Sequence, residues 1–142
     1  MGDFAHVYDN DLLLKDAGLV AASAAATVGG SAAILDLGQA MWHGDLCIDF
    51  NAIEFDTADE TYDILLQLSS KADFASDIVT KVSCPKGDAR NAADVDQNDL
   101  GLEVIPCNNK VGDTIYRYAR LYTVVGGTVA TGINYAAWLA KR

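Results

Sequence analysis

The stretch YRYARLYTVVGG, residues 116–127, alternates side chains of different character before a double glycine. Successive side chains of a strand point to opposite faces, so a strand here puts one set on a shared face: Tyr116, Tyr118, Arg120 and Tyr122. Ala119, Leu121 and Thr123 form the opposite side, which we expect to face the core. Such a row of aromatic and arginine side chains is typical of a surface that binds single-stranded nucleic acid or another protein. The rest of the sequence has to distinguish these two hypotheses.

Period-two alternation continues on both sides of this stretch. Leu46, Ile48 and Phe50 are the apolar positions of one strand, and the alternation slips near Ala52, which predicts either a β-bulge there or a strand that switches sheets. The sequence NNKVGD has the Asn, Gly and Asp of a hairpin. Further strands are expected over three ranges: 62–68, 78–82 and 133–139. Six or seven strands with almost no helical periodicity predict an all-β protein, an antiparallel sandwich or barrel.

The first forty residues follow a weaker pattern. Residues 17–38, AGLVAASAAATVGGSAAILDLG, are mostly small, and their alanines favour a helix while the double glycine favours an extended arm. We divide the chain into residues 1–32, an N-terminal arm or first edge segment, and residues 33–142, the β-sandwich domain. The arm is expected to dock on a neighbour through apolar anchors such as Phe4 and Tyr8. A chain that begins at Ser31 is then expected to stay folded.

The charge of the chain bears on its partners. It has 10 Lys and Arg against 20 Asp and Glu, a formal net charge of −10. Nucleic-acid binding depends on clustered cations, so this balance argues against a nucleic-acid partner, and the apolar runs are too short for a membrane span. The N-terminus lacks the features of a secretory signal, which predicts synthesis and use in the cytoplasm. Cys47, Cys84 and Cys107 lie far apart, and we expect them to be reduced and buried.

Patterns that could carry catalysis or bind metal fail in their details. Residues 94–99, DVDQND, begin like a calcium loop, but Asp99 stands where the turn needs glycine and Ile105 where a glutamate should ligate. A solvated acidic loop explains the run, and weak cation binding between Asp94 and Asp99 stays open. His43 and Cys47 are two possible zinc ligands where three or four are needed. Since no nucleophile motif lies near a histidine, we expect no catalytic residue, no metal and no cofactor.

Surface side chains are therefore the best candidates for function. Aromatic and arginine residues are enriched at protein interfaces, although burial in the core is the alternative for each tryptophan. The candidate interface residues are Tyr116, Tyr118, Arg120, Tyr122, Trp42, Trp138, Phe4 and Tyr8.

Three stretches resemble a known family. AILDLG, GDLCIDFNAIEF and YRYARLYTVVGGTVATGINYAAWLAK are similar to the small cement, or decoration, proteins of tailed-bacteriophage capsids. The resemblance runs from about residue 12 to residue 141 and is weakest over residues 84–101. It implies a jelly-roll β-sandwich with an N-terminal arm and no catalytic or cofactor residues. It also implies a homodimer or homotrimer on the outer surface of the virion that bridges major capsid protein subunits and stabilises the shell against internal DNA pressure.

Two other classes stay open at this stage. A carbohydrate-binding β-sandwich module also exposes aromatic side chains on its strands. A small enzyme on a β scaffold needs a pocket that converges on His43 or on a pair of carboxylates.

Overall fold

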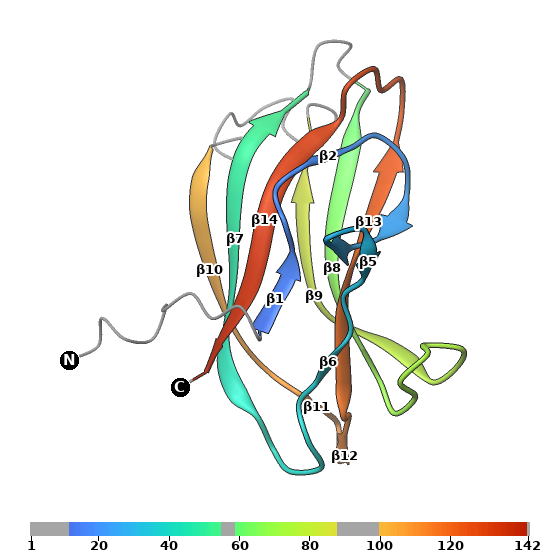
Figure 1. Cartoon of the computed structure of the whole chain (residues 1–142), viewed down its shortest axis with the longest axis vertical. Coiled ribbons are helices and arrows are strands. Elements are labelled where there is room, and N and C mark those ends of the chain that lie inside the picture. Colours follow the sequence, from blue (N-terminus) through green and yellow to red (C-terminus); the bar gives the residue numbers. More distant parts are fainter. Residues whose placement is uncertain (1–11, 55–58, 88–99, 142) are drawn as a thin grey trace, which may run out of the picture.

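The structure is a computed structural model that describes residues 12–54, 59–87 and 100–141, which fold into two antiparallel sheets packed face to face (Figure 1). Sheet A contains β1 (Leu13–Lys15), β2 (Leu19–Val20), β14 (Ile133–Lys141), β7 (His43–Ile53) and β10 (Gly101–Asn108). Sheet B contains β3 (Ala24–Ala25), β6 (Leu35–Asp36), β13 (Tyr118–Gly126), β8 (Thr61–Ser69) and β9 (Ile78–Lys86). Two small ribbons pair β4 (Thr27–Val28) with β5 (Ser31–Ala32) and β11 (Lys110–Val111) with β12 (Thr114–Ile115). The predicted all-β antiparallel sandwich is confirmed.

The order of the strands is that of a jelly roll. In sheet A, β1 and β2 share one edge and are followed by β14, β7 and β10. In sheet B, β3 and β6 share one edge and are followed by β13, β8 and β9. Among the long strands, only β8 and β9 follow one another within a sheet, and every other connection crosses between the sheets, as in double Greek-key sandwiches.

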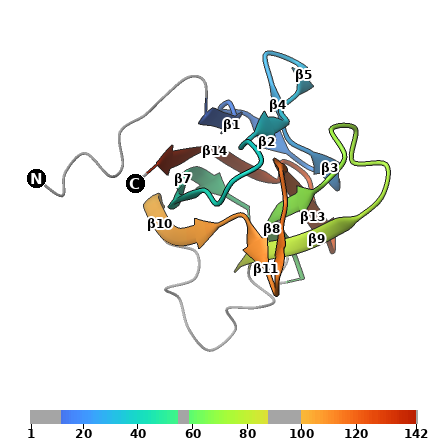
Figure 2. The ribbon, with the colours of Figure 1, turned by 90° about the horizontal axis from the view of Figure 1, so that it is seen from below.

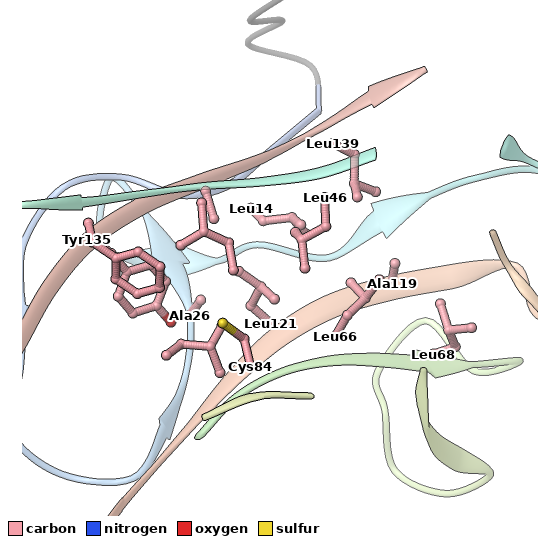
Figure 3. Packing of buried hydrophobic residues seen from close by; sticks show 14 of the residues in the cluster. Leu14, Ala26, Leu46, Leu66, Leu68, Cys84, Ala119, Leu121, Tyr135 and Leu139 are labelled. Atoms are coloured by element: carbon pink, nitrogen blue, oxygen red, sulfur yellow. The ribbon is translucent and has the colours of Figure 1, made fainter. Parts of the chain in front are cut away.

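The core lies between the sheets and follows the alternation of the sequence. The fully buried large side chains come from both sheets and include Leu46, Ile48, Tyr62, Ile64, Leu66, Leu68, Leu121, Tyr135 and Leu139. Figure 3 shows several of them meeting in the space between the two sheets. The hydroxyl groups of Thr123 and Tyr135, both buried, lie 2.5 Å apart, so they form a hydrogen bond with each other across the core.

The predicted bulge and hairpin are both present. Asn134 pairs with Ala52 and Tyr135 pairs with Phe50, which leaves Asn51 as the extra residue of a bulge in β7. The hairpin joins β11 to β12 through Gly112, whose φ of 59° suits glycine. This ribbon does not join two long strands of one sheet, because β10 pairs with β7 and β13 pairs with β8.

The alanine-rich segment is extended, and from Leu12 onward it forms edges of both sheets. β1 and β2 pair with β14, while β3 and β6 pair with β13. Leu14 is 0% exposed and Ala26 is 6% exposed, and both belong to the core cluster. Edge pairing satisfies the backbone of residues that are too small to form an apolar helical stripe. Phe4 and Tyr8, the expected anchors of an arm, lie outside the described residues.

A buried lysine fastens this segment to sheet A. The Lys15 ammonium donates hydrogen bonds to the carbonyl oxygens of Asp16, Gly18 and Tyr135 at 3.0, 2.9 and 2.7 Å. It also lies 4.4 Å from the centre of the Tyr135 ring. Burial lowers the pKa of Lys15, an effect that the nearby charge of Asp16 opposes. These carbonyl contacts stabilise β1 against β14.

A buried asparagine, Asn109, closes the sandwich directly before β11, the strand labelled at the lower end of Figure 1. The Asn109 side chain is 0% exposed and accepts a hydrogen bond from the Trp42 backbone N–H at 2.8 Å. Its amide donates to the carbonyl oxygens of Ala40 at 3.2 Å and Tyr116 at 2.9 Å. One side chain therefore binds three backbone groups from two segments, residues 40–42 and Tyr116, that have no common strand ladder.

Candidate protein-interaction surfaces

The outer face of sheet B carries the Tyr/Arg row, which we define as Tyr118, Arg120 and Tyr122. All three are half-buried, and the residues that alternate with them along β13 are buried in the core. The Arg120 Nε donates to the Gln67 side-chain oxygen at 2.9 Å. Its guanidinium lies 4.5 Å from the centre of the Phe74 ring and 5.5 Å from that of Tyr122. Because these contacts already order Arg120, little conformational entropy remains to be lost on binding a partner.

An ion pair extends the row toward the lower end of β13. Arg117 donates two hydrogen bonds of 2.8 Å to the Asp36 carboxylate, and its guanidinium lies 5.3 Å from the Tyr118 ring centre. The hydrogen bond from Arg117, helped by the backbone N–H of Gly38, lowers the pKa of Asp36 to about 2. Both partners are largely exposed, so the pair orients the end of the row more than it stabilises the fold.

Two of the predicted interface residues belong to the core instead. Tyr116 is 8% exposed and Trp42 is 6% exposed, and both pack in the core cluster. The alternation did not extend to Tyr116 because the strand is interrupted at residues 116–117, where the Tyr116 N–H donates to the Asn109 carbonyl at 2.8 Å. The Tyr116 side chain therefore points into the core and is not part of the Tyr/Arg row.

The outer face of sheet A carries an apolar set that sequence patterns did not single out. Trp138 on β14 and Val104 on β10 lie opposite Cys47 of β7, one on each side. Cys47 is 0% exposed although it points away from the core, which is the expected result of two bulky neighbours on the same face. Leu102 continues this face along β10 and is 54% exposed. We define the apolar outer face as Leu102, Val104, Pro106 and Trp138.

Alternation over LEVIP does not reveal this face. The stretch is short, and its apolar residues occupy both parities, so the sequence does not show which side is inward. The pairing of Leu102 with Asp49 and of Val104 with Cys47 decides it, because the core positions of β7 are Leu46, Ile48 and Phe50. Trp138, predicted from the sequence as an interface residue, is half-buried and lies on the same face.

At the upper end of Figure 1, two carboxylates bind the loop between β13 and β14. Glu54 accepts backbone hydrogen bonds from Ala130, Thr131 and Gly132, the shortest being 2.6 Å from Thr131. Asp59 accepts from the Thr128 N–H at 3.1 Å and from its hydroxyl at 2.9 Å. The hydrogen bond from Gly132, followed by those from Thr131 and Ala130, lowers the pKa of Glu54. This arrangement holds an exposed loop in one conformation.

We expect this loop attachment to weaken in acid. The pKa of Glu54 in the folded protein lies below its ordinary value of 4.5. The stabilisation that the Glu54 carboxylate gives to the loop is therefore complete above that pH. It is lost as the pH falls through the lowered pKa, because protonation removes the charge that the backbone N–H groups bind. Hydrogen exchange of the Thr131 and Gly132 amides, measured by NMR, should show protection at pH 7 that disappears on acidification.

Two variants test the role of Glu54 at pH 7. Glu54→Gln should lose the protection of these amides, while Asp63→Asn should keep it. Equal protection in both variants would contradict the role of Glu54.

The side chains considered for metal binding or catalysis do not converge. His43 is exposed at the start of β7, whereas Cys47 is buried between two strands. Burial raises the pKa of Cys47 to about 11, of Cys84 to about 12 and of Cys107 to about 11, so the thiolate form is disfavoured in all three. Within residues 12–54, 59–87 and 100–141, no group of three His, Cys, Asp or Glu side chains is placed to hold a metal ion. The acidic run from Asp94 to Asp99 lies outside these ranges.

Comparison with known proteins leaves the functional argument to the fold and its surfaces. Neither a scan against protein-family models nor a search of curated proteins finds a match to this chain. In the described part of the chain, no helix has the length and apolar character needed to cross a bilayer.

Proposed function

We propose that this protein is a capsid cement protein, which binds the outer surface of a tailed-phage head as an oligomer and bridges subunits of the major capsid protein. The observation that supports this most is the presence of two interface-like faces on one small sandwich. The Tyr/Arg row lies on the outer face of sheet B, and the apolar outer face belongs to sheet A. Sheets packed face to face direct their outer faces oppositely, so the molecule can contact two neighbours at once.

The two faces have the composition of protein contacts. Tyr118, Arg120 and Tyr122 combine aromatic area with hydrogen-bonding groups, and Trp138 and Leu102 add apolar area on the other side. The net charge of −10 is compatible with the outside of a shell and unfavourable next to packaged DNA. One hollow is lined by both His43 and Cys107, but burial raises the pKa of Cys107 to about 11, so the thiolate that a nucleophile needs is disfavoured there.

Bridging explains how such a protein stabilises a shell. Internal DNA pressure separates capsid subunits, and a protein bound across two of them adds contacts that have to break first. An oligomer that spans several subunits gains avidity of roughly 10²–10⁴ from effective concentration alone. Assembled shells should therefore bind the protein far better than free capsid subunits do.

The test is thermal release of DNA from phage heads with and without the purified protein. We expect the protein to raise the release temperature, and we expect Leu102→Asp and the double change Tyr118→Ser with Tyr122→Ser each to remove that effect. Each variant alters one face only. Loss of the rise in release temperature in both variants therefore indicates that both faces are needed, as bridging requires. Ser31→Ala, an exposed change on β5, serves as the control.

Three results would contradict the proposal. An unchanged release temperature with the native protein excludes a cement role. A salt-sensitive shift of DNA in a gel would instead support nucleic-acid binding. Saturable binding on a glycan array, lost with Tyr122→Ser, would favour a carbohydrate-binding module.

A further inference from the structure

A second feature of the surface lies at the lower end of the sandwich, on the open side between the edge strands of the two sheets. A hollow of about 480 Å³ is lined there by His43, Gly44, Lys81, Pro106, Cys107 and Asn108. These residues come from β7, β9 and β10. Figure 2 views the molecule from this end, where β11 lies beside β10 and β9. The hollow is separate from the Tyr/Arg row and shares Pro106 with the apolar outer face.

A β-bulge directs Lys81 into this region. Leu66 pairs with Val82 and Gln67 pairs with Thr80, so Lys81 is the extra residue in β9. Bulges re-aim a side chain and are frequent near functional sites. The Lys81 ammonium donates a 2.6 Å hydrogen bond to the Lys110 carbonyl, which fixes the position of the charge. Since an ammonium has three donors, two remain for a ligand.

The surroundings of the hollow are cationic in an otherwise acidic protein. Lys141 pairs with Gly44 at the end of β14, Lys110 begins β11, and His43 lies at the rim. Among the residues that the structure describes, the lining includes no Asp or Glu. The charge of Asp45, which is 2% exposed, helps to raise the pKa of Cys107, while Lys81 acts in the opposite direction.

We propose that this hollow binds carboxylate side chains of an acidic protein segment, and that, if the cement function holds, this segment belongs to the capsid partner. The hollow is large enough for a carboxylate group and its first methylene groups. Lys81 supplies a fixed ammonium, His43 adds a second donor group in the lining, and Lys141 is the strand partner of Gly44, another lining residue. The net charge of −10 works against long polyanions such as nucleic acid, whereas a short acidic segment brings few charges near the acidic remainder of the surface.

The test measures binding by the isolated full chain, so it does not depend on the capsid. An N-acetylated, C-amidated tetraglutamate peptide is titrated into ¹⁵N-labelled protein, and NMR follows the amides of Gly44, Cys107 and Asn108. We expect saturable shifts of these amides that weaken with salt. Lys81→Gln should weaken binding about tenfold or more, as the loss of a charge-assisted hydrogen bond does.

Two further variants separate the site from general charge effects. Lys141→Gln removes a cation from the strand partner of Gly44 without touching the Lys110 contact, so it tests the site even if Lys81→Gln disturbs the fold. Lys71→Gln removes one exposed charge from the loop between β8 and β9 and should bind the peptide as the native protein does. Equal weakening in Lys71→Gln would show that the attraction is non-specific and would overturn the proposal.

Other probes identify the source of the anionic group. Tetra-alanine with a free carboxyl terminus should not shift these amides, and inorganic phosphate should shift them only weakly. A tight response to phosphate, or to the free terminus in preference to tetraglutamate, would overturn the assignment to acidic side chains. Peptide binding without any effect on DNA release from heads would leave the hollow established and refute the cement function. An effect on DNA release without any binding of the peptide would refute the binding site in the hollow and leave the cement function standing.

Discussion

A chain that begins at Ser31 is expected not to fold, contrary to the expectation from the sequence that the first residues form a separable arm. The change removes β1, β2, β3 and β4, which pair with both sheets or with β5. It also removes Leu14, which is 0% exposed, and the three carbonyl contacts of Lys15. Loss of one buried leucine side chain typically costs about 2–5 kcal/mol, and a domain is stable by only about 5–15 kcal/mol.

Circular dichroism and thermal unfolding measure this outcome. The native chain should unfold in one cooperative transition, and the chain that begins at Ser31 should show none. A chain that begins at Leu12 is the matched control, since it keeps every described strand, and its transition should be close to that of the native chain. Leu14→Ala tests the core contact alone, with an expected loss of about 2–5 kcal/mol. Cooperative unfolding of the chain that begins at Ser31 would show that the edge strands are dispensable.

Asn109→Ala is expected to destabilise the protein by about 3–5 kcal/mol, because it leaves three backbone groups at the lower end of the core without their partner. These groups are the Trp42 N–H and the carbonyl oxygens of Ala40 and Tyr116. Each buried polar group that loses its hydrogen bond costs about 1–3 kcal/mol, and water can reach only part of this site. Trp42 and Tyr116 should become more mobile because Asn109 joins their backbones.

Urea unfolding followed by tryptophan fluorescence gives the change in the free energy of unfolding. Asn108→Ala is the matched control, since Asn108 is half-buried and its side-chain oxygen accepts one local hydrogen bond from the Lys110 N–H. Its expected cost is about 1 kcal/mol or less. A cost for Asn109→Ala no larger than that of Asn108→Ala would mean that the three contacts contribute little to the closure of the core.

The class of fold could be predicted from the sequence because alternation is a local property. The apolar positions of β7 and β8 are buried as expected, and the slip near Ala52 corresponds to a bulge at Asn51. Gly112 likewise marks a tight hairpin. A strand with one inward face has to show this period, so these features are visible without any knowledge of the partners of each strand.

The candidate surfaces could be predicted only in part. Tyr118, Arg120 and Tyr122 lie on one outward face, as alternation within a single strand requires. Tyr116 does not, because a break in the strand reverses the parity, and the sequence carries no clear signal for that break. The apolar outer face could not be predicted, since it unites residues of β10 and β14 that become neighbours only through β7.

The sequence by itself determined that this chain is an acidic, antiparallel β protein whose long strands have one apolar face each, because period, charge and turn residues act over a few positions. The tertiary structure decided which strands are neighbours, that residues 12–36 complete both sheets, and that Trp42 and Tyr116 close the core around Asn109. It also brought Lys81 and His43 to one hollow. These outcomes depend on hydrogen bonds and packing between residues far apart in the chain, which the pattern along a single segment does not contain.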